Sequence, residues 1–422
     1  MGRRILVVGG GGREHALAWR LARSPSVEHV AAAPGNPGMD ELGPTFPVDA
    51  DDPVMVADLA EREAVDLVVV GPEAPLVAGV VDELGRRGIP AFGPSAAAAH
   101  IEGSKAFAKR IMEAAGAPTA GYVATADAEE AYAALERFSP PYVVKADGLA
   151  AGKGVRICDE LVDAQQAVDD ALVHRRFGDA GANLVIEEFL DGPERSVFGV
   201  CDGQDVVLLA PAQDYKRALD GDAGLNTGGM GAYTPVPGFG LGDVEHLREL
   251  IFLPVLRALA DRGTPYRGLL YAGLVETATG PKLLEFNARF GDPETQVILP
   301  LFASDLGELL AASASGQVDD VEVAWHDGAA VTIVLASGGY PDSYPTGLPI
   351  TGVAEAARCD HVTVFHAGTR QQDGALVTAG GRVLDVTARG DDVPAARAAA
   401  YEAADRITFE AAHRRNDIAA GV

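Results

Sequence analysis

Cysteine is scarce in this chain of 422 residues: Cys158, Cys201 and Cys359 are the only three, and no two of them have the CxxC spacing. An odd number of widely spaced cysteines supports neither a disulfide framework nor a zinc knuckle, and it fits a reducing compartment. Long apolar runs are missing as well. The run from Ile5 to Val8 is too short for the core of a signal peptide, and no later run reaches membrane-spanning length. The sequence therefore predicts a soluble, cytoplasmic protein.

Positive charge is also in short supply. The chain has 34 Lys and Arg against 61 Asp and Glu, a formal net charge of -27, which repels nucleic acids and anionic membranes. We therefore expect no nucleic-acid or membrane partner. Lysine supplies only six of the basic residues, so each one is a candidate for a specific role. The six lysines are Lys105, Lys109, Lys145, Lys153, Lys216 and Lys282.

The chain is otherwise typical of a folded protein, with 48% hydrophobic residues and 50 Gly. Its length predicts several domains. Short apolar strands alternate with helical patterns over roughly the first 100 residues, which favours an open, mostly parallel sheet. Long glycine loops then separate the strands, and hairpin signals mark the last part. We expect an N-terminal α/β domain at 1–103, a central domain at 104–320 and a C-terminal α+β domain at 326–422.

Four glycines, Gly9–Gly12, lie between the first predicted strand and a helix, a position that suits a bound phosphate. They do not match the dinucleotide pattern GxGxxG, because the third glycine would fall on Glu14 or His15 and the second strand lacks an acidic ribose ligand. We therefore favour another phosphate ligand over NAD, with a plain tight turn as the alternative. Arg13 and His15 could neutralise a monophosphate, although His15 could equally form a hydrogen bond at the helix start.

A second glycine loop occurs in KADGLAAGKGV, where Lys145 ends a predicted strand and Lys153 follows in the loop. The loop is not a P-loop, because only three residues separate Gly148 from Gly152 and because Gly154 replaces the Ser or Thr that binds magnesium. Two lysines across a strand-to-loop junction could hold different oxygens of a polyphosphate. The alternative, ordinary surface charge, is disfavoured by the rarity of lysine.

The segment KLLEFNARFGDPET combines a strand pattern with oxygen ligands. Side chains alternate along a strand, so Glu285, Asn287 and Arg289 are expected on one face. The other face would carry Leu284, Phe286, Ala288 and Phe290. A carboxylate and an amide oxygen suit Mg²⁺, which completes its shell with water and phosphate. An amphipathic surface strand is the alternative, and the Asp292 and Glu294 that follow make it less attractive.

Two weaker patterns remain. The segment IEEFLDGPE runs from a strand at Glu187 into a turn with Leu190 and Glu194. Such a hinge can present main-chain groups to a purine and a carboxylate to ribose hydroxyls, although an edge strand with a turn explains it equally well. Farther on, Asp214 and Lys216 combine charges of opposite sign, and Asn226 begins a glycine loop. Such a loop lets a ligand approach the backbone closely.

Taken together, GGGGREHALAW, GPEAPLVAGVVD, EGSKAF, KADGLAAGKGV, IEEFLDG, NTGGMGAY, EFNARFGDPETQ and GGRVLDVTA resemble the phosphoribosylamine–glycine ligase family of ATP-grasp enzymes in purine synthesis. The resemblance runs almost end to end and in order. It implies an α/β fold with a Rossmann-like pre-ATP-grasp domain, an ATP-grasp domain whose segment 122–190 includes a mobile nucleotide-covering part, and a small C-terminal domain. It also implies a monomer.

The activity that the resemblance implies has two steps. Glycine's carboxylate attacks the γ-phosphate of ATP to give glycyl phosphate and ADP, and the amine of 5-phosphoribosylamine then displaces phosphate to give glycinamide ribonucleotide. Positioning and charge neutralisation by cations and Mg²⁺ or Mn²⁺ suffice for such chemistry, so a side-chain nucleophile is not needed.

Site residues follow from the same resemblance. ATP phosphates would contact Lys105, Lys145 and Lys153, with Gly152 and Gly154 in the covering loop. The nucleoside would contact Glu187, Leu190 and Glu194. The metal would be held by Glu285 and Asn287. Catalytic roles would fall to Lys145, Lys153, Arg289 and Asp292. Glycine and the acyl phosphate would meet Asp214, Lys216, Asn226 and Arg289. Phosphoribosylamine would face Gly10, Gly12, Arg13, Glu14, His15, Pro72 and Glu73.

Three alternatives stay open. Another ATP-grasp carboxylate–amine ligase or carboxylase would share the nucleotide site, but GGGGREHA and RFGDPETQ argue against it. A nucleotide sensor would not need the complete Lys and Glu-Asn set, and an oxidoreductase would bind NAD(P). The sequence departs from the family pattern at Tyr215, where His is expected, and at Leu225, where Pro is expected. All the lysines except Lys109 lie in or beside these motifs, which predicts a positive site inside a negative shell.

Overall fold

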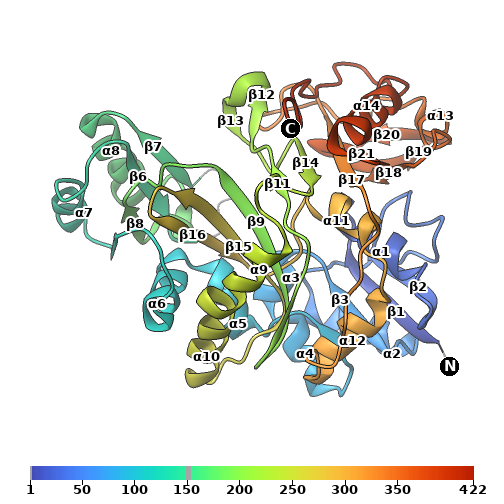
Figure 1. Ribbon diagram of the computed structural model, residues 1–422, viewed down its shortest axis with the longest axis horizontal. Helices are drawn as coiled ribbons and strands as arrows, with labels where there is room; N and C mark the ends of the chain where they lie inside the picture. The colour runs from blue at the N-terminus through green and yellow to red at the C-terminus, as the bar shows by residue number, and fades with distance from the viewer. Residues whose placement is uncertain (1, 149–153) are drawn as a thin grey trace.

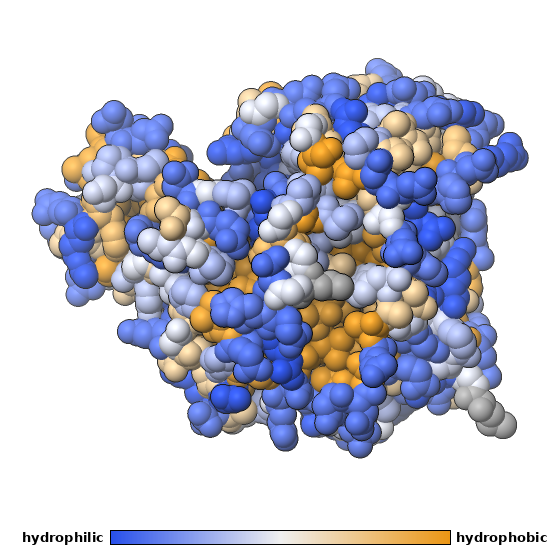
Figure 2. Space-filling view, in the orientation of Figure 1, coloured by the Kyte–Doolittle hydropathy of each residue, from blue (hydrophilic) through white to orange (hydrophobic). Residues whose placement is uncertain are grey.

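The computed structural model describes residues 2–148 and 154–422. Figure 1 shows a lobe of N-terminal helices and strands, a second lobe at the far end that contains α7 and α8, and a third formed by the C-terminal part of the chain. Hydrophilic residues cover most of the visible face in Figure 2, and the surface is hollowed between the α7–α8 lobe and the lobe that carries β12 and β13. No helix within the described residues is long and apolar enough to cross a membrane.

The N-terminal segment forms a parallel sheet in the order β2-β1-β3-β4. The elements are β1 (Arg3–Gly9), α1 (Gly12–Leu21), β2 (Val27–Pro34), α2 (Pro53–Arg62), β3 (Leu67–Val70), α3 (Glu73–Ala78), α4 (Val80–Arg86), β4 (Ala91–Phe92) and α5 (Ala96–Gly103). The predicted open parallel sheet is thus confirmed.

Helices cover both faces of this sheet, which explains why β1 is an unbroken apolar run. Ile5 and Val7 pack in one cluster with Leu17 of α1, whereas Leu6 and Val8 pack in another with Val56 of α2. All six side chains are fully buried. The strand therefore places its carboxyl end, followed by the four glycines, at the edge where α1 begins.

The central segment begins with an antiparallel sheet in the order β5-β8-β6-β7, which has a hydrophobic cluster of its own. The elements are α6 (Lys105–Ala115), β5 (Tyr122–Thr125), α7 (Ala128–Leu135), β6 (Tyr142–Ala146), β7 (Val155–Cys158), α8 (Leu161–Val168), η1 (Asp169–Val173), η2 (Gly178–Gly181) and β8 (Leu184–Glu187). Because this cluster is separate, the sheet and its two helices form a subdomain that stands apart in Figure 1.

A second antiparallel sheet, in the order β10-β9-β15-β16, forms the body of the central segment. Its strands are β9 (Glu194–Asp202), β10 (Val206–Leu208), β15 (Arg267–Thr277) and β16 (Gly280–Asn287). Helices of this part are α9 (Leu241–Leu247), η4 (Arg248–Phe252), α10 (Leu253–Asp261), α11 (Thr295–Leu301) and α12 (Leu306–Ser315).

The C-terminal sheet, in the order β11-β14-β17-β21-β18, takes two of its strands from the central segment. Those two are β11 (Gln213–Asp214) and β14 (Gly231–Thr234), and a hairpin of β12 (Arg217–Leu219), η3 (Asp220–Asp222) and β13 (Ala223–Asn226) projects between them. The remaining elements are β17 (Ala329–Ala336), α13 (Val353–Ala356), β18 (Val362–His366), β19 (Thr369–Gln372), β20 (Ala375–Thr378), β21 (Arg382–Gly390) and α14 (Val393–Ala404). The C-terminal part is therefore fastened to the segment that carries Asp214.

Strand β16 differs from the simple alternation that the sequence predicts. Its register against β15 shifts at Leu284, between Leu283 and Glu285, so that Leu283 is fully buried and Leu284 is only half-buried. Such a bulge re-aims side chains locally. Beyond it the alternation holds: Phe286, Ala288 and Phe290 are buried, as expected. The prediction that Leu284 belongs to the core face was therefore wrong.

Candidate active site

Lys145 lies at the centre of a buried group of charges. Strand β6 lies beside β8, and Lys145 of β6 forms an ion pair with Glu187 of β8. Lys109 of α6 pairs with the other oxygen of the same carboxylate. Burial alone would raise the pKa of Glu187, but the two lysines outweigh it and the pKa is lowered. The shared carboxylate therefore fixes the position of the Lys145 ammonium group.

Lys109 is one site residue that the sequence analysis did not identify. It lies outside every recognised motif, yet it is only 3% exposed and also contacts Thr119 Oγ1 at 2.9 Å. Burial lowers its pKa, an effect that Glu187 opposes. The signal that could have found it is the rarity of lysine together with its place one helical turn after Lys105 on α6.

We expect Lys109→Met to destabilise the fold by about 3–5 kcal/mol, because it leaves the Glu187 carboxylate with one partner in a buried setting. Adding Glu187→Gln should recover part of the loss, since the uncompensated charge is then gone. Urea unfolding of the wild type, the single variant and the double variant measures both effects. A single variant as stable as the wild type would show that Lys109 does not support this carboxylate.

Lys105 begins α6 beside the base of the glycine loop. Ser104 caps the helix and donates to Asp147 Oδ1 at 3.0 Å, while the Lys105 ammonium donates to the Gly148 carbonyl at 3.3 Å. Burial lowers the pKa of Lys105, against the nearby charge of Glu285. Gly154 is buried at the far end of the loop. The predicted Lys153 and Gly152 lie outside the described residues.

Glu285 on β16 lies in a positive environment. Burial raises the pKa of its carboxyl group, but Lys216, Lys145, Lys105 and Arg289, in that order, reverse the effect, and the pKa is lowered. No side chain in the described parts of the chain forms a hydrogen bond or ion pair with this carboxylate. The charges of four cations, from α6, β6 and the segments that follow β11 and β16, thus act on this one carboxylate.

Asn287 and Arg289 continue the same face of β16. Asn287 Oδ1 accepts a hydrogen bond from Arg289 at 3.1 Å. Arg289 also pairs with Glu102 of α5 at 3.1 Å and with Glu73 of α3 at 3.4 Å. Those carboxylates outweigh the burial that would lower its pKa, so the pKa of Arg289 is raised. The arginine therefore links β16 to the loop of Pro72 and Glu73, as the predicted grouping requires.

Asp214 and Lys216 flank the end of β11, close to Glu194 at the start of β9. Lys216 forms an ion pair with Glu194. Burial raises the pKa of Asp214 to about 7. Burial alone would lower the pKa of Lys216, but the neighbouring carboxylates outweigh it and the pKa is raised. Asn226 lies on the projecting β13, where it is exposed and pairs along the backbone with Arg217. Among the described residues its side chain forms no hydrogen bond with the charged group.

A small apolar cluster lies next to these charges. Leu190 packs with Ala120 and Val275, and Leu284 packs against them from β16. The bulge that turns Leu284 out of the core thus turns it toward Leu190. The cluster offers a flat apolar support beside the lysines, which suits an aromatic ring.

The N-terminal glycine loop is tightly packed around Glu14. Gly11 caps α1, and its amide donates to Glu14 Oε2 at 2.7 Å; the other oxygen accepts from Arg13 at 2.5 Å. A Cβ on Gly71 would lie 2.3 Å from this carboxylate, and one on Gly12 would lie 1.9 Å from Asp385 Oδ2. Glu14 therefore shapes the loop from beneath, and the helix start faces the GDPET segment.

His15 is buried against the C-terminal part of the chain. Its Nδ1 accepts a hydrogen bond from the His366 amide at 2.8 Å, and its ring lies edge-on to Phe365. Burial, with a smaller contribution from His366, lowers the pKa of His15 to about 3. A neutral ring cannot neutralise a phosphate, so of the two roles left open for His15 the geometry favours hydrogen bonding at the helix start.

This depressed pKa has a consequence for stability. In the unfolded chain His15 binds a proton near pH 6.5, whereas in the folded chain it does so only near pH 3. The stability of the fold therefore falls as the pH falls between these values. Between pH 6.5 and 4.5 the loss due to His15 should be about 2 kcal/mol. His15→Asn keeps an acceptor and cannot titrate, so its stability should fall less over this range in urea unfolding. Parallel pH profiles for the two proteins would contradict the assignment.

The C-terminal part of the chain contacts the site at Asp292. Arg382 of β21 pairs with Asp292 at 2.8 Å and also donates to the carbonyls of Asp292 and Gly228. Gln296 donates to Asp292 at 2.7 Å and to Asp385 at 2.9 Å. Sequence reasoning quoted GGRVLD but gave Arg382 and Asp385 no role, since only the fold shows that β21 lies against this loop.

Models of one protein family match almost the whole chain, in three pieces: the phosphoribosylglycinamide synthetase N domain at residues 3–102, its ATP-grasp (A) domain at 103–295 and its C domain at 330–421. The chain belongs to the phosphoribosylglycinamide synthetase family. The three-part architecture confirms the predicted fold class, and membership in an ATP-grasp family implies the use of ATP with a divalent metal.

Individual relatives agree with the family models. The phosphoribosylamine–glycine ligase of Streptomyces coelicolor is 52% identical over 421 residues, which cover 99% of each chain. The crystal structure of the phosphoribosylamine–glycine ligase of Thermotoga maritima has a TM-score of 0.85 and 36% identity, and the match covers 99% of this chain and 100% of that one. The biotin carboxylase of Campylobacter jejuni, at 15% identity, a TM-score of 0.72 and coverage of 97% and 93%, shares the fold alone.

Proposed function

We propose that this protein joins glycine to 5-phosphoribosylamine at the expense of ATP, through glycyl phosphate, to give glycinamide ribonucleotide, ADP and phosphate in purine synthesis. The observation that carries the proposal is the set of four cations, Lys105, Lys145, Lys216 and Arg289, whose charges act together on the carboxylate of Glu285. Lys105 belongs to α6 and Lys145 to β6, whereas Lys216 follows β11 and Arg289 follows β16. Named members of the family are phosphoribosylamine–glycine ligases. We also propose a monomer in the cytoplasm.

Charge neutralisation explains how these four cations would promote the reaction. A carboxylate is a poor acyl donor, and transfer of the γ-phosphoryl group to it brings several negative charges together. Fixed cations in a water-poor site lower the barrier without having to reorganise during the reaction. Lys145 is fixed by Glu187 and Arg289 by Glu73 and Glu102, so both are pre-organised before the substrates arrive.

Glu285 and Asn287 are the residues proposed to hold Mg²⁺ or Mn²⁺. Their oxygens are the hard ligands that these ions prefer, and two protein ligands suffice when phosphate and water complete the shell. The pKa of Glu285 is lowered, so the carboxylate is ionised and competent to bind. When bound, the ion would neutralise charge on the phosphates between Lys145 and Lys105.

The nucleoside half of ATP would lie on the apolar cluster of Leu190, Ala120, Val275 and Leu284. Glu187 is 1% exposed and its carboxylate binds two lysines. We therefore propose that Glu187 acts on the nucleotide through Lys145, and that apolar contact with adenine falls to Leu190 instead. To bind the ribose hydroxyls, the Glu194 carboxylate would have to break its ion pair with Lys216.

Phosphoribosylamine would bind at the start of α1, beside Gly10 and Gly12, where the helix dipole favours a phosphate. Arg13 brings a permanent positive charge and is held in place by Glu14 and the Phe290 carbonyl. The amine would then point toward Asp292 and Arg289, where the acyl phosphate forms.

A coupled assay of ADP release tests the proposal. Turnover should require glycine and phosphoribosylamine together, with little ADP released when either is omitted. ADP release with bicarbonate in place of glycine would instead support an ATP-grasp carboxylase and would overturn the proposal. Binding of ATP and metal without any product would support a nucleotide sensor.

A further inference from the structure

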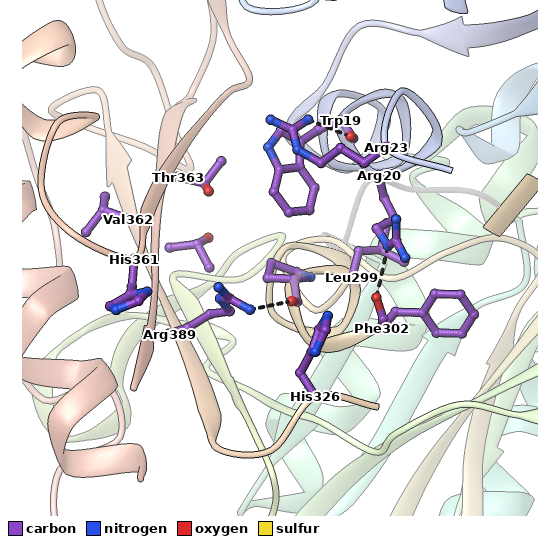
Figure 3. A pocket seen from close by; sticks show the side chains of 12 residues that line it. Trp19, Arg20, Arg23, Leu299, Phe302, His326, His361, Val362, Thr363 and Arg389 are labelled. Atoms are coloured by element: carbon purple, nitrogen blue, oxygen red, sulfur yellow. Dashed lines mark hydrogen bonds between the residues drawn. The ribbon is translucent and has the colours of Figure 1, made fainter. Parts of the chain in front are cut away.

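A second cavity, of about 430 Å³, lies between α1, α11 and the C-terminal sheet, away from the charged group described above (Figure 3). Trp19 and Arg23 approach it from the N-terminal part, and Thr363 and Arg389 from the strands β18 and β21. Its volume falls in the range of small-molecule sites. The remaining lining residues are Arg20, Leu299, Pro300, Phe302, His326, His361, Val362 and Thr387.

The lining contains three arginines and two histidines but no acidic residue. In a chain with a net charge of -27 this grouping is unusual. Among the residues that the structure describes, none of Arg20, Arg23 and Arg389 forms an ion pair with a carboxylate. Burial lowers the pKa of Arg20 and of Arg23, which is the response of cations that lack full compensation.

Each arginine is positioned by carbonyl groups and keeps other donors free. Arg20 donates to the Phe302 carbonyl at 3.0 Å and to the Ser304 carbonyl at 2.6 Å, and Arg389 donates to the Pro300 carbonyl at 3.5 Å. These bonds place both guanidinium groups at the C-terminal end of α11, and such helix capping accounts for part of their role. Since a guanidinium has five N–H donors, most of those on Arg389 remain available.

The other walls of the cavity are apolar or hydroxyl-bearing. The Trp19 ring lies under the Arg23 guanidinium at 4.3 Å and edge-on to Phe365 at 5.8 Å. Leu299 adds an apolar wall, and Thr363 and Thr387 add hydroxyl groups. A single tetrahedral anion would contact the arginines but would leave the rest of the cavity empty.

We propose that this cavity binds a phosphorylated small organic molecule, with its phosphate on the arginines and its organic part against Trp19 and Leu299. The site is distinct from the one in which the ligation takes place. Trp19 follows Gly12 by two turns of α1, about 10 Å along the axis, and the cavity borders the end of α11 opposite Gln296. A bound ligand bridges α1 and the C-terminal sheet, and so stabilises the contact on which Asp292 depends.

Trp19 makes the site directly observable. The chain has two tryptophans, and Trp325→Phe removes the other one, which packs on Phe302. In this variant we expect the fluorescence emission of Trp19 to change and saturate as AMP or ribose 5-phosphate is added. Inorganic phosphate should bind with lower affinity, and adenosine should cause no change. Saturation by adenosine, equal affinity for inorganic phosphate and both esters, or no response to any probe would overturn the proposal.

Variants separate this cavity from the substrate site. Arg389→Gln, made in the Trp325→Phe background, should weaken ester binding at least about 10-fold, the effect of losing a charged hydrogen-bond donor. The exposed Arg370, which binds Gln372 instead, offers a matched control, and Arg370→Gln should leave the affinity unchanged. His361→Glu, at an exposed position on the rim, should also weaken binding. Unchanged affinity in both cavity variants would assign the response to the substrate site and contradict the proposal.

Discussion

Replacing Lys145 by alanine is expected to lower kcat by roughly 100-fold or more, the usual cost of losing a pre-organised charge at a transferring group. The reason lies in the buried ion pair with Glu187, which holds the ammonium group beside Lys105 and Glu285. Steady-state rates of ADP release with saturating ATP, glycine and phosphoribosylamine measure the effect.

The control for this experiment is Lys109→Met, which disturbs the same carboxylate from its other side. Both substitutions remove one partner of Glu187, so both should destabilise the fold. Only Lys145→Ala should also lose the phosphate-facing charge, so its rate should fall well below that of Lys109→Met at a temperature where both remain folded. Equal rates in the two variants would mean that Lys145 acts by supporting the fold alone.

Glu285→Ala is expected to raise the Mg²⁺ concentration needed for half-maximal activity by at least roughly 10-fold, since even residues that only support metal ligands cost that much affinity. The substitution also leaves Lys216, Lys145, Lys105 and Arg289 without the carboxylate that compensates them. Activity measured over a magnesium titration at fixed ATP tests the prediction.

Glu188 offers the matched control for Glu285. Its carboxylate lies in the hinge, 3.7 Å from Lys282, and is half exposed. Glu188→Ala should leave the magnesium titration unchanged, because neither residue belongs to the charged group around Glu285. An unchanged titration in Glu285→Ala as well would refute the assignment of a metal ligand.

Much of the fold follows from local pattern. The β1 run, the glycines after it and the α1 helix could be predicted because each depends on residues close together in the chain. The three parts of the chain were recognisable for the same reason. Strand alternation alone predicted that Glu285, Asn287 and Arg289 share one face, and in the structure the charges of Lys105, Lys145 and Lys216 act on Glu285.

The remaining features depend on contacts between distant segments. The bulge in β16 comes from pairing with β15, which the β16 sequence alone does not encode. Likewise, Lys109 gains its role from a carboxylate 78 residues later in the chain, and Arg382 from an aspartate 90 residues earlier. Side chains far apart in sequence meet only when the sheets are assembled, so neither position stood out.

The structure shows where the few positive charges of this acidic chain are located. The rare lysines gather where ATP is proposed to bind, with Lys145 and Lys109 almost fully buried. Arginines gather in the second cavity, between α1 and the C-terminal sheet. The net charge of -27 thus coexists with groups of buried or half-buried cations, at which we propose that anionic ligands bind.

The central claim is that glycine's carboxylate takes the phosphoryl group before the amine attacks, and glycine labelled with ¹⁸O in its carboxylate tests it directly. The oxygen that attacks the γ-phosphate stays with phosphorus when the amine displaces phosphate. Mass analysis of the released phosphate should therefore find one ¹⁸O atom per molecule formed, and glycinamide ribonucleotide should keep the other. Phosphate without ¹⁸O would contradict the account.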